Sequence, residues 1–211
     1  MRTTPLYAGG LVPLVLAALA ACSGQPQQPA QPEEDSPYNG SDIEGAFTLP
    51  DTDFTTTEGE NYNLREDSSG TTTAVFFGFT NCPDICPTTM ADLGQAVDQL
   101  DEDQRERFGV VFVTADPERD DRELIDRWLG SFDPSFTGLR GPLDRTDDAA
   151  ESMGISIDRP EPEERSGDYN VGHGSQVLVF SPEGESELMW DYGTEPAAMA
   201  EDVTALLAED A

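Results

Sequence analysis

Two unbroken apolar runs, at residues 74–79 and 108–114, constrain the fold of this chain more than any other feature. Runs of this length without polar alternation are typical of strands that are buried on both faces of a sheet. Between them, Met90, Leu93 and Val97 recur at helical spacing and indicate an amphipathic helix. Two buried strands joined through a helix need further helices on both faces, so the sequence predicts an α/β fold.

The rest of the chain continues this alternation of helix and strand patterns. Helices are predicted at residues 118–132, 146–153 and 196–208, and a hairpin of two strands at 176–180 and 187–192. Together these elements predict a three-layer α/β sandwich with a central mixed sheet.

The N-terminus has the pattern of a secretion signal followed by a lipidation site. Residues 1–21 combine Arg2 with an apolar run and small residues before Cys22. The tetrapeptide that ends in Cys22 resembles a bacterial lipobox, which implies that Cys22 is lipidated and holds the chain on a membrane. The alternative is an ordinary cleaved signal peptide with a chance cysteine.

A linker is expected between this signal and the folded part. Residues 22–42 are rich in Pro, Gln and Glu, a composition that cannot form a core and favours a semi-extended spacer. The remaining residues, 43–211, have the length and patterning of one domain with a single core.

The charge of the chain is strongly negative. It has 43 acidic residues against 11 basic ones, a formal net charge of −32, and every basic residue is arginine. Such a surface repels phosphate groups, which excludes nucleic acid and anionic lipid headgroups as partners. We interpret the charge as a means of solvation in a salty exterior. The alternative, a surface that collects cations, would be screened by the same salt.

The cysteines and the histidine of the predicted domain are Cys82, Cys86 and His173. The cysteines follow the first buried strand, and Pro87 is expected at the first position of the next helix. This is where α/β sheets place functional groups. Helix-start N–H groups should lower the pKa of both thiols, which could then chelate a soft ion or close a disulfide. A purely structural disulfide is the alternative, although so short a loop would stabilise little.

His173 lies between Gly172 and Gly174, just before a predicted strand and after residues 156–170, which are expected to form a surface loop. A lone histidine is commonly structural, but flanking glycines allow the backbone to approach a site closely. Two cysteines and one histidine suit Cu(I) or a Cu(II)–thiolate centre. Structural zinc normally takes a fourth protein ligand.

Three motifs resemble those of the Sco/SenC family of membrane-anchored copper proteins. Residues 77–87 (Phe-Gly-Phe-Thr-Asn-Cys-Pro-Asp-Ile-Cys-Pro) resemble its signature, residues 116–120 (Asp-Pro-Glu-Arg-Asp) its second motif, and residues 171–175 (Val-Gly-His-Gly-Ser) its histidine motif. The likeness covers about residues 43–208.

This resemblance implies a thioredoxin-like fold in which Cys82, Cys86 and His173 bind copper as Cu(I) or Cu(II). Asp116 is expected either near the metal, as a weak outer ligand or behind a ligand, or as the cap of the helix that follows.

The resemblance also implies a metallochaperone rather than an enzyme. Family members help to assemble the dinuclear copper A centre in a subunit of cytochrome c oxidase, as copper donors, as reductants of that subunit's cysteines, or both. We therefore expect a monomer, lipid-anchored on the extracytoplasmic face of the cell membrane, with the copper A subunit as its partner.

Three other functions fit the sequence less well. A general thiol–disulfide oxidoreductase usually has two residues between its cysteines and a cis-proline loop, whereas Cys82 and Cys86 enclose three residues. A peroxiredoxin needs an arginine near its reactive cysteine, and none is evident in the sequence. A structural lipoprotein would leave the three motifs as coincidence.

Overall fold

The computed structural model describes residues 36–165, 167 and 169–209. The signal at residues 1–21, Cys22 and the linker up to residue 35 lie outside the described residues. Within the described part of the chain, no helix has the length and apolar character needed to cross a membrane.

The secondary structure alternates as expected, with more strands than the sequence indicated. In chain order the elements are β1 (Ser41–Asp42), β2 (Asp53–Thr56), β3 (Asn61–Asn63), β4 (Thr72–Gly78), α1 (Ile85–Gln99), α2 (Glu102–Arg107), β5 (Phe108–Thr114), α3 (Arg122–Leu129), β6 (Thr137–Arg140), α4 (Leu143–Ser152), β7 (Ile157–Asp158), the 3-10 helix η1 (Pro162–Glu164), β8 (Gly172–His173), β9 (Val177–Phe180), β10 (Ser186–Trp190) and α5 (Pro196–Glu209).

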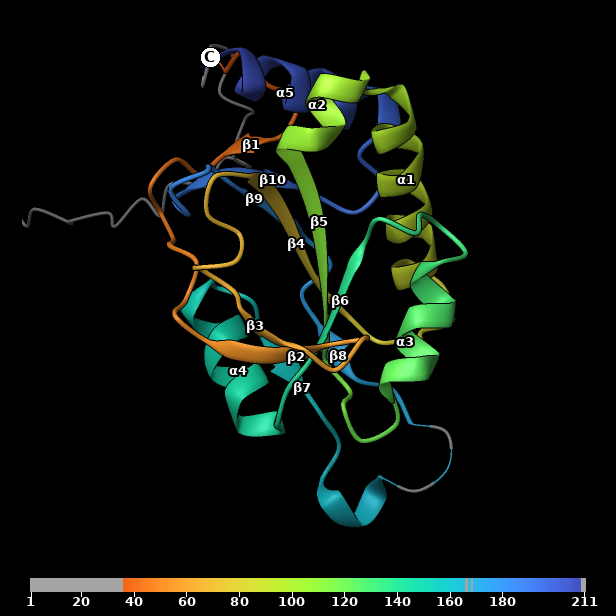
Figure 1. The fold of residues 1–211 in the computed structure, drawn as a ribbon. Coiled ribbons are helices and arrows are strands. Elements are labelled where there is room, and N and C mark those ends of the chain that lie inside the picture. Colours follow the sequence, from red (N-terminus) through yellow and green to blue (C-terminus); the bar gives the residue numbers. More distant parts are fainter. Residues whose placement is uncertain (1–35, 166, 168, 210–211) are drawn as a thin grey trace, which may run out of the picture. The chain divides into compact units, whose positions relative to one another are not determined.

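Eight of the strands form one mixed sheet in the order β1-β10-β9-β4-β5-β6-β2-β3 (Figure 1). The buried strands β4 and β5 are parallel and central, paired from Thr72 with Phe108 to Gly78 with Thr114. Strand β9 runs antiparallel to β4 and also to β10, with which it forms the predicted hairpin. Strands β7 and β8 form a separate two-stranded sheet.

Helices cover both faces of this sheet. Ala74 and Phe76 of β4 belong to a core cluster that includes residues of α1, α3 and α5. Val75 and Phe77, which point the opposite way along the same strand, belong to a second cluster that includes residues of α4. The predicted three-layer α/β sandwich with a mixed sheet is therefore confirmed.

Three helix starts differ from the prediction, and one of them is that of α4, which begins at Leu143 rather than at residue 146. Helix α3 begins at Arg122 rather than at residue 118, because the Asp121 side chain accepts a hydrogen bond from the Leu124 N–H at 2.7 Å and caps it there. Helix α1 begins at Ile85, so Pro87 is its third residue and not its first.

A buried carboxylate joins the start of the described chain to its last helix. Asp202 of α5 accepts hydrogen bonds from the backbone N–H groups of Asn39 and Gly40, at 2.7 and 2.9 Å, and from the indole N–H of Trp190 at 2.9 Å. Residues 39–40 are thereby fixed against α5.

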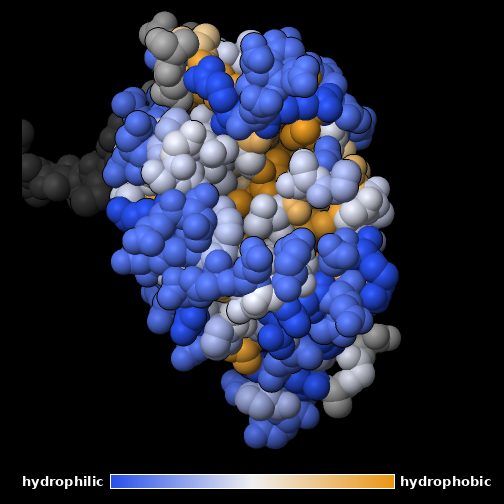
Figure 2. Space-filling view, in the orientation of Figure 1, coloured by the Kyte–Doolittle hydropathy of each residue, from blue (hydrophilic) through white to orange (hydrophobic). Residues whose placement is uncertain are grey.

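The surface matches the acidic composition. Figure 2 shows hydrophilic residues over most of the visible face. Among the described residues, Ile85 and Tyr192 are the large hydrophobic side chains that are exposed. Ile85 lies between the two cysteines of the candidate site.

Candidate metal centre

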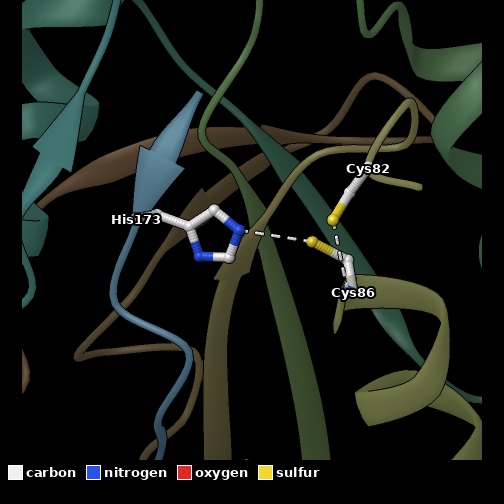
Figure 3. A group of neighbouring side chains, drawn as sticks. All are labelled: Cys82, Cys86 and His173. Atoms are coloured by element: carbon white, nitrogen blue, oxygen red, sulfur yellow. Dashed lines mark hydrogen bonds between the residues drawn. The ribbon is translucent and has the colours of Figure 1, made fainter. Parts of the chain in front are cut away.

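The fold brings together the three residues that the sequence singled out. The Sγ atoms of Cys82 and Cys86 and a ring nitrogen of His173 all lie within 4.8 Å of one another. The Cys86 Sγ atom is 3.3 Å from Nε2 of His173 (Figure 3). The cysteines flank the start of α1, whereas the histidine comes from β8.

The cysteine loop leaves the sheet where β4 ends. The residue before α1, Asp84, makes no side-chain capping bond, and the Cys86 N–H instead points to the Cys82 Sγ at 3.4 Å. The sulfur of Cys82 thus takes the place that a capping oxygen usually fills. A Cβ at Gly78 would lie 2.9 Å from the Phe112 ring and 3.2 Å from the Cys86 Sγ, so this glycine lets Cys86 pack on the strand end.

The protonation of Cys86 differs from the expectation. Cys86 is 0% exposed, and this burial, with a hydrogen bond to Cys82, raises the pKa of its thiol. The prediction that the helix start would lower its pKa is therefore wrong, because loss of hydration outweighs the helix-start N–H groups. Both cysteines are free thiols, and a cation at the site would have to displace the proton of Cys86.

His173 presents one ring nitrogen to the cysteines. Its Nδ1 lies 2.7 Å from the Gly174 carbonyl oxygen, which can only accept, so Nδ1 carries the proton and the unprotonated Nε2 accepts from the Cys86 thiol. Burial lowers the pKa of the ring and so favours this neutral form. The edges of Phe76 and Phe79 pack against the imidazole, with ring centroids 5.8 and 5.9 Å away.

The glycine after the histidine lies close to its neighbours. A Cβ at Gly174 would lie 2.5 Å from Oε1 of Gln176, so the Gln176 side chain would have to move. The Gly174 N–H also donates to the carbonyl oxygen of Ser156, the residue before β7, at 3.1 Å. This hydrogen bond ties the histidine segment to the β7 segment, and the close approach to the site that the flanking glycines predict stays a prediction.

Asp120 holds the cysteine loop against the end of β5. Its buried carboxylate accepts hydrogen bonds from the Thr80 N–H at 3.1 Å, the Thr80 hydroxyl at 2.5 Å and the Thr114 hydroxyl at 2.6 Å. Burial raises the pKa of Asp120, and these hydrogen bonds oppose that rise. Sequence reasoning placed Asp120 only within a matched motif and missed this role.

Asp116 neither belongs to the ligand cluster nor caps the helix that follows. Asp121, not Asp116, caps α3. Within the part of the chain that the structure describes, the metal-ligand atoms that gather at this site come from Cys82, Cys86 and His173, without Asp116. Its carboxylate instead pairs with Arg119 and accepts a hydrogen bond from the Tyr169 hydroxyl at 2.9 Å.

The donor set limits which cations fit. Two sulfurs and one unprotonated imidazole nitrogen are soft and borderline ligands, which suit copper better than calcium or magnesium. The same two thiols could alternatively form a disulfide.

Comparison with known proteins identifies relatives along most of the chain. Residues 35–208 match the SCO1/SenC family. The chain is 33% identical over 142 residues to the mitochondrial SCO1 homolog of Homo sapiens, which covers 67% of this chain and 45% of that protein. It is 36% identical over 129 residues to the human SCO2 homolog, over 61% and 47% of the two chains. The chain thus spans about half the length of these curated relatives.

Solved structures give the same result. The apo Sco1 protein from Thermus thermophilus superposes with a TM-score of 0.66 at 31% identity, covering 82% of this chain and 96% of that one. Yeast Sco1 with copper bound superposes with a TM-score of 0.71 at 23% identity, covering 77% and 89%. The thioredoxin-like fold is confirmed, and the chain belongs to the SCO1/SenC family.

Proposed function

We propose that this protein is a copper carrier that holds its cargo through Cys82, Cys86 and His173. The observation that carries the proposal is the gathering of two thiol sulfurs and one imidazole nitrogen within 4.8 Å. A relative supports it: the Arabidopsis thaliana ScoI structure, with copper bound, has a TM-score of 0.66 and 25% identity to this chain.

The recipient in this proposal is the copper A subunit of cytochrome c oxidase. BsSco, a protein of the same fold (TM-score 0.62, 18% identity), is described as a member of the Sco family of cytochrome c oxidase assembly proteins. Family membership therefore supports assembly of the copper A centre as the purpose of the carrier, which binds and releases copper without acting as an enzyme.

In this proposal the thiolates and the imidazole contribute differently to copper binding. Two thiolates suffice to hold Cu(I), and the imidazole adds the third ligand that Cu(II) favours. The Gly174 carbonyl keeps the proton of His173 on Nδ1, so Nε2 is ready to bind. Because Cys86 must lose a proton, copper uptake should weaken as the pH falls.

A second candidate function rests on the same pair of free thiols. Cys82 is the more accessible of the two, so its thiolate would attack a partner disulfide and form a mixed disulfide. The Cys86 thiolate would then displace the partner, leaving a Cys82–Cys86 disulfide and a partner with two reduced thiols. Two electrons pass to the partner, as reduction of copper A cysteines would require.

The location we propose follows from the N-terminal pattern. A signal at residues 1–21, a lipidated Cys22, a linker and a monomeric folded domain would place the site on the extracytoplasmic face of a membrane. The linker ends earlier than the predicted residue 42, because residues 39–40 bind Asp202 and residues 41–42 form β1. A SCO1/SenC family lipoprotein from Bacillus anthracis has the same fold, with a TM-score of 0.65 at 20% identity.

An anaerobic copper titration of the reduced chain without its signal peptide, residues 23–211, tests this function. We expect one copper per chain and, after oxidation, a thiolate-to-copper charge-transfer band that is lost in Cys82→Ser and in Cys86→Ser. His173→Ala should weaken Cu(II) binding far more than Cu(I) binding.

Folding of each variant is checked by circular dichroism. No stoichiometric copper binding, together with a readily cycled Cys82–Cys86 disulfide, would instead favour the second function. A full Cu(II) spectrum in His173→Ala would contradict the ligand set.

A further inference from the structure

The strand that carries the histidine has little support of its own. Strand β8 consists of Gly172 and His173, and among the described strands it pairs with β7 alone, through Ile157 and Asp158. It lies outside the eight-stranded sheet from which the cysteine loop emerges. Other contacts must therefore set the position of His173 relative to the cysteines.

One such contact lies four residues before the histidine. The Tyr169 hydroxyl donates to Oδ1 of Asp116 at 2.9 Å, across 53 residues of sequence. The carbon at the centre of the Arg119 guanidinium lies 3.6 Å from the centroid of the Tyr169 ring. Arg119 also forms an ion pair with Asp116. We name these three residues the Asp116–Arg119–Tyr169 cluster.

This cluster also touches the cysteine side of the site. The Arg119 guanidinium lies 5.7 Å from the centroid of Phe79, and the Phe79 ring packs edge-on against His173. The next residue of the same turn, Asp120, binds Thr80. A single five-residue turn, 116–120, thus contacts both segments that carry ligands.

Burial makes the Asp116 carboxylate dependent on its protein partners. Asp116 is 1% exposed, so its carboxylate depends on protein donors in place of water. Both Nη atoms of Arg119 are buried without a hydrogen-bond partner among the described residues. Arg119 therefore acts through its Nε, which pairs with Asp116, and through its flat face, which packs on Tyr169 and Phe79. The Tyr169 hydroxyl is the group that joins the histidine segment to this fixed pair.

We propose that the Asp116–Arg119–Tyr169 cluster positions His173 as a ligand, with the Tyr169 hydroxyl as the deciding contact. The inference rests on the proposed copper site and names residues that act through the histidine without touching the metal. Its consequence is selective: loss of the contact should weaken binding of Cu(II), which needs the imidazole, and spare binding of Cu(I), which two thiolates hold.

The test compares Tyr169→Phe with Tyr62→Phe in the reduced chain, residues 23–211. Tyr62 is a matched control because its hydroxyl also makes one partly buried hydrogen bond, to Ser68 at 3.0 Å, on strand β3. Competition titrations give the dissociation constants for Cu(II) and Cu(I). Proton–nitrogen NMR of the metal-free proteins reports on the imidazole, and the chain has a single histidine, so its signals need no assignment by mutation.

In Tyr169→Phe we expect the Cu(II) dissociation constant to rise about tenfold, the usual size of an effect from behind a ligand. The Cu(I) constant should stay within about twofold, the imidazole signals should shift or broaden, and Tyr62→Phe should match the parent in all three measurements. Parent-like Cu(II) affinity together with parent-like imidazole signals in Tyr169→Phe would overturn the proposal. Equal losses of Cu(II) and Cu(I) affinity would overturn it as well.

Failure of the copper function is distinguishable from failure of this inference. If the parent chain binds no Cu(II), the proposed function is contradicted, and the metal-free NMR alone decides the positioning role. Imidazole signals that change in Tyr169→Phe but not in Tyr62→Phe would then support it, and unchanged signals would refute it.

Discussion

Carboxylates are buried in two regions of this molecule, and the two regions use them differently. Asp202 receives hydrogen bonds from uncharged N–H groups and fixes residues 39–40 and Trp190 to the last helix. Near the cysteines, Asp116 and Asp120 bind side chains from segments that carry or adjoin metal ligands. Asp202 stabilises the packing of the chain ends, whereas Asp116 and Asp120 fix the positions of the segments next to the candidate metal ligands. Stability and metal binding should therefore respond separately to changes in the two regions.

The largest effect on stability is expected at Asp202. Asp202→Ala leaves the Asn39, Gly40 and Trp190 donors without their partner, and we expect the free energy of unfolding to fall by about 3 kcal/mol. Urea unfolding measures this loss. Copper affinity should stay within about twofold of the parent, because the metal ligands lie in other segments.

An exposed aspartate, Asp191→Ala, serves as the matched control and should be nearly neutral. A large loss of copper affinity in folded Asp202→Ala would show that the two regions are coupled. It would contradict the expectation that stability and metal binding respond separately.

A smaller but more local effect is expected at Asp120. Asp120→Asn keeps the size of the side chain but weakens its hold on Thr80, at a cost of about 1 kcal/mol in stability. Because Thr80 adjoins the cysteine loop, alkylation of buried Cys86 by iodoacetamide should become about fivefold faster, while Cys82 reacts first in parent and variant alike. Mass spectrometry of each cysteine follows the reaction. An unchanged Cys86 rate would mean that Asp120 supports stability alone.

The smallest expected effect is a difference in pH dependence. Burial raises the native pKa of Asp120 above its value in the unfolded chain, near 4. The stability that this group contributes is complete below that pH and is lost as the pH rises through the native pKa. Asparagine does not titrate, so the advantage of the parent over Asp120→Asn should shrink as the pH rises from about 4. Urea unfolding at a series of pH values tests this, and an advantage that grows with pH would contradict it.

The central part of the fold was predictable because its signals are local. The apolar run 74–79 predicted β4, and the run 108–114 predicted β5 with the bounds that the structure has. The missed strand β6 has only four residues, and its Gly138 carries no side chain to reveal a pattern. A Cβ at Gly138 would lie 2.6 Å from the Ile125 side chain, so this glycine is explained by the packing of α3 against β6. A local sequence pattern does not reveal such a tertiary contact.

The site was predictable in its members but not in its environment. The folded part contains two cysteines and one histidine, so counting thiol and imidazole ligands sufficed to nominate Cys82, Cys86 and His173. The raised pKa of Cys86 depends on its complete burial, which its position near a helix start does not reveal. Tyr169 was overlooked because its partner lies 53 residues away and its segment reads as a surface loop.

The small size of the β7–β8 pair has a kinetic meaning for a carrier. A strand joined by two residue pairs opens at far lower free energy than one in the middle of an eight-stranded sheet. With the proposed ligands, the two thiolates would set the affinity for Cu(I), whereas opening of the β7–β8 pair would set the rate at which the imidazole is released. The affinity for Cu(I) and the residence time of the imidazole ligand would then depend on different segments of the chain, so mutation could change the rate of delivery without changing the capacity to load Cu(I).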